Sequence, residues 1–258
     1  MVFTFAEMNI SSKNNPENNN WFKDWFNSPY YHLLYKNRDH NEARNFIVHL
    51  FNHLQPKINA KILDIACGKG RHAVQMNKLG YNVDAFDLSE NSIKAAKEFE
   101  NDSLHFYVND IRTPLKLNNY DYCFNLFTSF GYFVHEKDNY KAIKAIANSM
   151  SKNGVFVMDF MNTSKVTKKL IPVEKKVVDD VIFNITRKVD NDFIVKKIEF
   201  TDKGQTYQYE EKVKIISLAS FKDYFNAAGL KLTTTFGDYN LSSFDVTSSD
   251  RLIMIVEK

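Results

Sequence analysis

A glycine-containing turn between a strand and a helix is the strongest chemical signal in the sequence. The run Leu63-Asp64-Ile65-Ala66-Cys67-Gly68-Lys69-Gly70 holds two of the eight glycines of the chain, and Asp87 lies nineteen positions after Gly68. Glycines at such a turn let a ligand approach bare backbone at the carboxyl edge of a sheet. An acidic residue about 20 positions later is placed to accept hydrogen bonds from both ribose hydroxyls. The pattern therefore predicts a site for a nucleoside-containing cofactor.

The glycines alone leave two cofactor classes open. With Ala73, the turn also fits the looser dinucleotide pattern G-x-G-x-x-A. Asp64 would then lie near a pyrophosphate, where like charges in a partly dry site repel each other, whereas the sulfonium and ammonium groups of S-adenosylmethionine are cations that an acidic strand end favours. Asp110 follows a later strand, where its carboxylate can accept from an adenine amino group and the backbone N–H of Ile111 can donate to the ring. The acidic residues favour the cationic cofactor.

Alternating strands and helices position this turn. A helix follows the turn and stops at Gly80, Ser89 caps a second helix that runs to about Phe99, and residues 139–150 form a third, closed by Lys152-Asn153-Gly154. The expected strands are residues 62–66, 81–88, 104–108, 120–127 and 155–160. Strands separated by helices of this length indicate an α/β fold with a parallel sheet and helices on both faces.

The chain before this core has a different composition. Residues 11–20 (SSKNNPENNN) are polar and rich in asparagine, and we predict a flexible lead-in over residues 1–20. Aromatic residues then recur with helical spacing up to Tyr35, with a break at Ser28-Pro29 that suits a helix start, and a further helix is expected over residues 41–54. We therefore expect N-terminal cap helices over residues 21–55 and the cofactor-binding core over residues 56–164.

The sequence pattern changes after the core. Polar and apolar residues alternate in three runs, 181–185, 193–200 and 207–215, separated by turns at 190–192 and 202–204. This pattern predicts an antiparallel β meander inserted over residues 165–216, which serves either the substrate or a dimer contact. Residues 217–258 then supply a helix over 218–228, capped by Gly229, and two strands at 230–236 and 252–257 that complete the core.

On these segments the chain resembles the class I S-adenosylmethionine-dependent methyltransferases. In that family the first motif is similar to residues 64–70, the ribose acid matches Asp87, the adenine acid matches Asp110, and the fourth strand ends in a segment like residues 125–129. The resemblance covers about residues 57–160. It implies a Rossmann-like seven-stranded sheet whose last strand is antiparallel.

The resemblance also implies a set of site residues. Enzymes of this shape often fold their first helices over the cofactor, so that Tyr31 or Tyr35 reaches it, and Lys69 or Arg71 would hold its carboxylate. The cofactor-binding residues implied are Tyr31, Asp64, Ala66, Gly68, Gly70, Arg71, Asp87, Leu88, Asp110, Ile111, Asn125, Leu126 and Phe127.

The segment after the fourth strand bears on the acceptor. Residues 125–132 (NLFTSFGY) look most like small-molecule enzymes such as amino-sugar and glycine N-methyltransferases, but Tyr132 stands where several of those place a histidine. Tyr132 and His135 are therefore the candidates for a catalytic proton acceptor. The N/D-P-P-Y signature of enzymes that methylate exocyclic base amines is absent.

Composition excludes several other functions. The 34 basic and 31 acidic residues give a net charge of +3, too mild to make nucleic acid or a membrane the expected partner. Cys67 and Cys123 form neither a disulfide framework nor a zinc motif, so we expect no metal and a cytoplasmic protein. The sequence thus predicts transfer of a methyl group from S-adenosylmethionine to N, O or C of a small molecule, by a monomer or homodimer. A nicotinamide-dinucleotide oxidoreductase and a non-catalytic module that binds the adenosyl cofactor are the alternatives.

Overall fold

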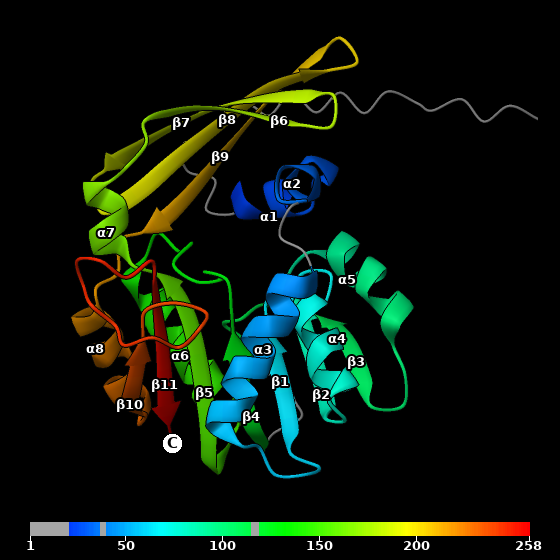
Figure 1. The fold of residues 1–258 in the computed structure, drawn as a ribbon, viewed down its shortest axis with the longest axis vertical. Helices are drawn as coiled ribbons and strands as arrows, with labels where there is room; N and C mark the ends of the chain where they lie inside the picture. Colours follow the sequence, from blue (N-terminus) through cyan, green and yellow to red (C-terminus); the bar gives the residue numbers. More distant parts are fainter. Residues whose placement is uncertain (1–20, 37–39, 115–118) are drawn as a thin grey trace, which may run out of the picture.

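The computed structural model describes residues 21–36, 40–114 and 119–258, so the lead-in expected at residues 1–20 lies outside the described part of the chain. Figure 1 shows an α/β core below and a small antiparallel sheet above it, with two short helices between the two sheets. The C-terminus lies at the end of the core that faces away from the small sheet.

A mixed seven-stranded sheet forms the centre of the core. Its strands are β1 (Lys61–Ile65), β2 (Asn82–Asp87), β3 (Leu104–Val108), β4 (Tyr120–Asn125), β5 (Met150–Met161), β10 (Lys231–Phe236) and β11 (Arg251–Glu257). Their order is β10-β11-β5-β4-β1-β2-β3, and β11 runs antiparallel to both of its neighbours while the pairs from β5 to β3 are parallel. This arrangement confirms the predicted sheet and its antiparallel last strand.

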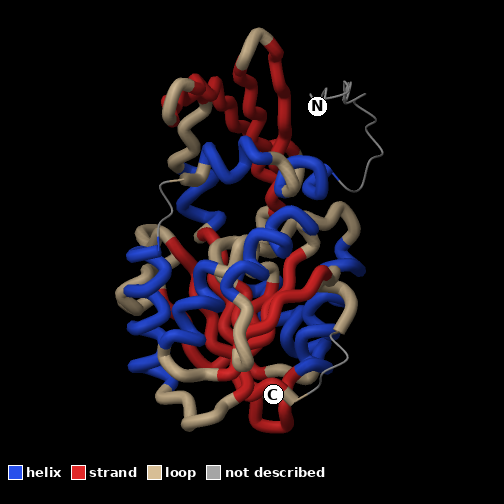
Figure 2. Tube along the Cα trace, turned by 90° about the vertical axis from the view of Figure 1, so that its right-hand side faces the viewer, coloured by secondary structure: helices blue, strands red, loops and turns tan. Residues whose placement is uncertain are grey.

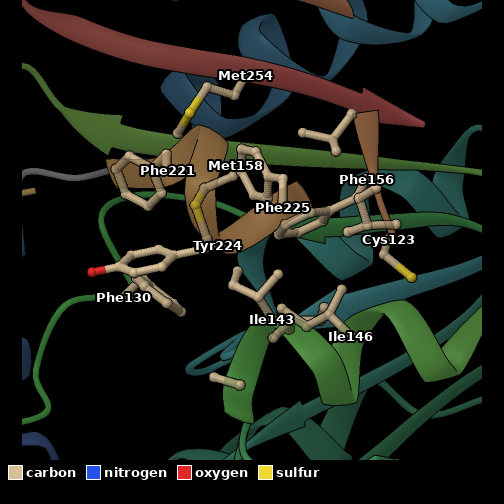
Figure 3. Packing of buried hydrophobic residues seen from close by; sticks show 14 of the residues in the cluster. Cys123, Phe130, Ile143, Ile146, Phe156, Met158, Phe221, Tyr224, Phe225 and Met254 are labelled. Carbon is tan, nitrogen blue, oxygen red and sulfur yellow. The ribbon is translucent and has the colours of Figure 1, made fainter. Parts of the chain in front are cut away.

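Helices cover both faces of this sheet, as Figure 2 shows from the side. One face carries α3 (His40–Leu54), α4 (Arg71–Lys78) and α5 (Glu90–Ala96), and the other carries α6 (Glu136–Ser149) and α8 (Leu218–Ala228). Successive strand residues point to opposite faces, so Ile62 packs under the first group of helices and Leu63 under the second. In Figure 3, Phe221 and Phe225 of α8 and Ile143 of α6 meet on that second face.

Two core elements differ from the sequence-based expectation. Strand β5 begins at Met150, so the expected turn at Lys152-Asn153-Gly154 lies inside the strand, where the pairing with β4 shifts register. Helix α3, which we grouped with the cap helices, instead packs Phe46 and Leu50 against the sheet. Both differences arise from tertiary pairing that local sequence patterns do not report.

The small sheet has four antiparallel strands: β6 (Val173–Val178), β7 (Val181–Asp190), β8 (Phe193–Asp202) and β9 (Gln205–Lys214). It follows α7 (Thr163–Lys168), which comes directly after β5. Strand β6 was not predicted, because it is an edge strand with charged residues at its centre and with only one of its six residues buried. The inserted antiparallel meander itself is confirmed.

The two N-terminal helices pack beneath this sheet. They are α1 (Trp21–Phe26) and α2 (Pro29–Leu34), and the Ser28 side chain caps α2 by accepting from the Tyr30 N–H. A separate apolar cluster joins them to the meander: Trp25, Leu34, Val178, Val181, Phe183, Ile185, Ile198 and Phe200. Asn27 also contacts the core, because its side chain accepts from Ser89 and Asn91. We call α1, α2 and β6–β9 together the roof.

Because the roof has its own apolar cluster, it should open without unfolding the core. Phe183 is fully buried, with its ring 4.8 Å from that of Phe200, and Phe183→Ala should destabilise the roof by about 3–5 kcal/mol. Hydrogen exchange should then accelerate in β6–β9 and α1–α2 but not in β4 or α6. The neighbouring Ile182 is 52% exposed, so Ile182→Ala is the matched control and should change neither. Equal acceleration in roof and core would contradict this division.

Candidate active site

A cavity of about 600 Å³ lies between the carboxyl edge of the core sheet and the roof. Most of the site residues expected from the sequence line it: Tyr31, Ala66, Gly68, Arg71, Asp87, Leu88, Asp110, Ile111, Leu126, Phe127 and Tyr132. Asp64, Gly70, Asn125 and His135 do not line it. The loops after β1, β2, β3 and β4 therefore converge with α2 on one space.

The two glycines of the turn have different structural roles. Gly68 has φ +57°, and a Cβ built there would meet no atom within 4 Å, so the backbone is bare toward the cavity. Gly70 has φ +80° and begins α4, and a Cβ there would lie 2.5 Å from Phe106 Cε1. Gly68 thus leaves room for a ligand, whereas Gly70 is needed for close packing of the helix on the sheet.

The Asp87 carboxylate ties the end of β2 to this turn. Its Oδ2 accepts from the Gly68 N–H at 2.9 Å, and its Oδ1 accepts from the Ser89 N–H at 2.8 Å. Burial raises the pKa of Asp87, and these backbone N–H groups oppose that rise. Since an ionised carboxylate has about four acceptor positions, Asp87 can still accept from two hydroxyls in the cavity.

Asp64 lies behind the turn with an unsatisfied oxygen. It is fully buried, and its Oδ2 has no hydrogen-bond partner among the described residues. Burial raises its pKa to about 7; the Asp87 charge also raises it, while Arg71 and the Ala73 backbone N–H act against the rise. Asn125 beside it donates to the Ile65 carbonyl at 3.1 Å. A cationic group in the adjoining cavity would stabilise the ionised form of Asp64.

Asp110 is engaged differently from the expectation. It lines the cavity, but its carboxylate already forms a two-pronged ion pair with Arg112, at 3.0 Å from Nε to Oδ1 and 2.6 Å from Nη2 to Oδ2. Arg112 also lies 3.7 Å from Asp138. Any contact of Asp110 with a ligand must therefore use the remaining lone pairs of a carboxylate that is held in place by Arg112.

Neither expected proton acceptor is suited to that role. The Tyr132 hydroxyl lines the cavity but donates to the Thr128 carbonyl at 2.6 Å, and burial raises its pKa well above the usual value, so it stays protonated. His135 is exposed at the N-cap position of α6, outside the cavity lining. The structure thus places His135 away from any acceptor bound in the cavity.

A histidine that the sequence did not single out does line the cavity. His32 of α2 has a buried Nε2 without a hydrogen-bond partner in the described part of the chain. Burial, and to a lesser extent Lys69, lowers its pKa to about 4, so the ring is neutral near pH 7. Its place on a short aromatic helix gave no spacing signal in the sequence.

The chain leaves β4 through two strained residues. Phe127 has φ 64° and Thr128 has φ 60°, a conformation that costs on the order of 1–3 kcal/mol for each residue other than glycine. The Phe127 N–H donates to Asp159 Oδ2 at 2.8 Å, and the Thr128 N–H donates to the Asp159 carbonyl at 2.9 Å. Arg251 donates from Nε to Asp159 Oδ1 at 2.7 Å and from Nη2 to Thr128 Oγ1 at 2.9 Å.

The roof adds a charged residue to those of the sheet edge that line the cavity. Glu211 of β9 lines it and accepts from Trp25 Nε1 at 2.7 Å and from the Tyr35 hydroxyl at 2.9 Å. Lys196 Nζ lies 3.2 Å from Glu211 Oε2 and donates to the Tyr35 hydroxyl at 2.7 Å. The pKa of Lys196 is lowered by burial, although Glu211 opposes this. These contacts join α1 and the end of α2 to the meander, and of these residues only Tyr35 was expected from the sequence to reach the cofactor.

Two kinds of site are not seen in the described residues. No group of three or more His, Cys, Asp or Glu side chains within residues 21–36, 40–114 and 119–258 is placed to hold a metal ion. Over the same residues, no helix combines the length and apolar character that crossing a membrane would require.

Fold and site together define a class of protein. The seven-stranded sheet has an antiparallel last strand, its carboxyl edge carries a bare glycine turn, and the Asp87 carboxylate at the end of the next strand accepts from that turn. These features are those of the S-adenosylmethionine-dependent methyltransferase fold. The unsatisfied Asp64 carboxylate and the cavity volume both suit a cationic adenosyl cofactor.

Comparison with known proteins identifies the family. A sequence profile described as a methyltransferase domain matches residues 56–214, which is more than half of the chain. The chain therefore belongs to the S-adenosylmethionine-dependent methyltransferase family, and its cofactor is S-adenosylmethionine.

Curated relatives match shorter segments. The probable S-adenosyl-L-methionine-dependent methyltransferase TehB of Haemophilus influenzae is 38% identical over 65 residues, which cover 24% of this chain and 23% of the relative. A putative methyltransferase of Geobacillus sp. (strain WCH70) is 28% identical over 109 residues, 41% of this chain and 44% of the relative. The chain thus matches less than half the length of these relatives.

Solved structures share the fold over most of the chain. An S-adenosylmethionine-dependent methyltransferase from Clostridium acetobutylicum superposes with a TM-score of 0.74 at 20% identity, covering 85% of this chain and 92% of the other. CalS10, an amino pentose methyltransferase from Micromonospora echinaspora solved with S-adenosylmethionine bound, superposes with a TM-score of 0.66 at 16% identity, covering 89% and 97%.

The burial of Asp64 makes stability depend on pH. Between about pH 4 and pH 7, folded Asp64 retains a proton that the unfolded chain, with a pKa of 3.8, has lost, so its contribution to stability falls as pH rises through this window. The shift corresponds to about 4 kcal/mol. Urea unfolding at pH 4.5 and 7.5 measures this. From the lower to the higher pH, the free energy of unfolding of Asp64→Asn should rise by about 2–4 kcal/mol relative to that of the wild type. Exposed Asp102→Asn is the control, and identical pH dependence of wild type and Asp64→Asn would refute the prediction.

Proposed function

We propose that the protein transfers a methyl group from S-adenosylmethionine to a small-molecule acceptor bound under the roof. One observation carries the proposal: a single cavity joins the Asp87 carboxylate at the sheet edge to Glu211 of the roof and to Tyr35, the residue that follows α2. Its volume of about 600 Å³ lies within the range of about 300–1,000 Å³ typical of small-molecule sites. The cavity thus suits a cofactor with a small acceptor rather than a macromolecular segment.

The residues of the sheet edge would hold the cofactor. Asp87 would accept from the ribose hydroxyls, and Ile111, together with Arg112-bound Asp110, would contact the adenine. Arg71, whose guanidinium carbon lies 4.7 Å from the centroid of the Phe127 ring, would hold the carboxylate. When bound, the cofactor supplies a methyl carbon activated by its sulfonium.

The chain itself contributes enclosure and orientation. Aromatic residues of α1 and α2 cover the cavity: the Phe26 ring lies 5.2 Å from Tyr132 and 5.0 Å from Tyr31. Exclusion of water and alignment of two reactants account for much of the rate in such a transfer. This role needs neither Tyr132, which stays protonated, nor His135, which lies outside the cavity lining. Glu211 is the carboxylate that the roof presents to an acceptor with an N–H or O–H group.

The acceptor class follows from the same features. CalS10 is described as an amino pentose methyltransferase, which supports a small polar acceptor for this chain as well. Nucleic acid is not proposed as a substrate. The meander is proposed as a substrate cover rather than a dimer element, because Glu211 and Val213 of β9 line the cavity.

Cofactor binding should depend on Asp87. The carboxylate would form two charge-assisted hydrogen bonds to ribose hydroxyls, so Asp87→Ala should weaken binding of S-adenosylhomocysteine by roughly 2–4 kcal/mol, measured by calorimetry. The exposed Asp102→Ala variant serves as a control for the loss of one negative charge. Unchanged affinity in folded Asp87→Ala would remove Asp87 from the site.

Turnover tests the proposal as a whole. Incubating the protein with S-adenosylmethionine and pools of small amines, alcohols and amino sugars should release S-adenosylhomocysteine, detected by mass spectrometry, only when an acceptor is present. Methylation of RNA or of protein, with none of the small-molecule pools active, would contradict the proposed acceptor class. Tight cofactor binding without any turnover would favour the non-catalytic alternative.

A further inference from the structure

The strained turn after β4 is the part of the site that the proposed function leaves unexplained. Phe127 and Thr128 both have positive φ, although neither is glycine, and both line the cavity. Such residues persist only where their surroundings fix them, and they concentrate at ligand-binding sites. The contacts around the turn must therefore hold it in this conformation.

Five hydrogen bonds from distant segments fix the turn and its support. Asp159 of β5 accepts from the Phe127 N–H through its side chain and from the Thr128 N–H through its carbonyl. Its two carboxylate oxygens also accept from Arg251 Nε at 2.7 Å and from the Tyr239 hydroxyl at 3.2 Å. Arg251 then reaches back from β11 to the Thr128 hydroxyl. The Asp159 side chain is 0% exposed, so these partners surround it completely.

An ion pair between a fully buried carboxylate and a largely buried guanidinium needs a reason other than stability. Removing two charges from water costs about as much as their attraction returns, and apolar residues often replace such pairs without loss. The Asp159 carboxylate accepts a hydrogen bond from the backbone of the turn. Arg251 also lines the cavity. The pair thus fixes a backbone conformation that local sequence preference opposes.

The place of the turn decides which half of a ligand it affects. The turn follows β4, whereas Asp87 ends β2 and Asp110 follows β3, so these acids lie two and three strands away in the sheet order. Adjacent strands are about 4.8 Å apart, which separates the turn from the acids by about 10 Å or more. Phe127 instead contacts Arg71 at the start of α4. The turn consequently lies on the Arg71 side of the cavity, where the proposed function places the amino-acid half of the cofactor.

We propose that Asp159 and Arg251 are positioning residues that hold the strained Phe127–Thr128 turn in the conformation that receives the amino-acid half of the cofactor. The proposal rests on the proposed function only for the identity of the ligand. Neither residue contacts the reacting atoms in this account. They act through the backbone of the turn, and their effect is confined to the side of the cavity next to β1 and β4.

Two ligands distinguish a positioning role of Asp159 and Arg251 from a general effect on the stability of the protein. S-adenosylhomocysteine carries the amino-acid half, and 5′-methylthioadenosine lacks it. Asp159→Asn keeps a similar volume but turns an amide N–H toward groups that donate to the Asp159 carboxylate. In this variant, affinity for S-adenosylhomocysteine should fall at least tenfold, while affinity for 5′-methylthioadenosine should stay within about threefold. Arg251→Lys should show a smaller loss with the same selectivity, because one donor is retained. Calorimetry on the full chain measures both.

Matched controls make each outcome decisive. Asp250→Asn removes an exposed ion pair with Lys165 one residue from Arg251, does not touch the turn, and should bind both ligands as the wild type does. Where Asp159→Asn does not fold, Thr128→Ala removes only the hydroxyl that Arg251 binds and should show the same selective loss. Equal weakening of both ligands, or no weakening of either, in a folded variant overturns the positioning role. A wild-type protein that binds neither ligand refutes the proposed function instead.

Discussion

The negative charge at the carboxyl ends of β1 and β2 is the constraint around which the site is built. Asp64 and Asp87 lie on neighbouring parallel strands, and both are largely or fully removed from solvent. Asp87 is satisfied by two backbone N–H groups, one of which closes the glycine turn, whereas one oxygen of Asp64 has no partner among the described residues. One carboxylate therefore shapes the turn, and the other favours a cation in front of it.

The roof makes this edge of the sheet into a cavity. It is held by its own apolar cluster and by the contacts of Trp25, Tyr35 and Lys196 with Glu211, so the N-terminal helices and the meander form one packed cover. The insertion leaves the core directly after β5, whose end lies beside the turn that follows β4. The cover of the cavity is thus built from segments more than 150 residues apart in the chain.

Local patterns were sufficient for the core but not for its long-range contacts. The glycine turn, Asp87 and the alternation of strands and helices depend on near neighbours, and these predictions of sheet and family are confirmed. Strand β6 and the irregular start of β5 depend on pairing partners instead. Asp159 gave one unused signal, a carboxylate within an apolar strand, but its link to Arg251 spans 92 residues and exists only in the folded sheet.

A titration of the protein near pH 7 tests whether the buried carboxylates favour an adenosyl ligand that carries an ammonium group. Calorimetry with S-adenosylhomocysteine in two buffers of different ionisation enthalpy gives both affinity and proton exchange. We predict saturable binding with release of part of a proton, because the ligand ammonium favours ionised Asp64, whose pKa is raised to about 7 by burial. We also predict no binding of NAD⁺. Saturable binding of NAD⁺ without binding of S-adenosylhomocysteine would contradict both predictions.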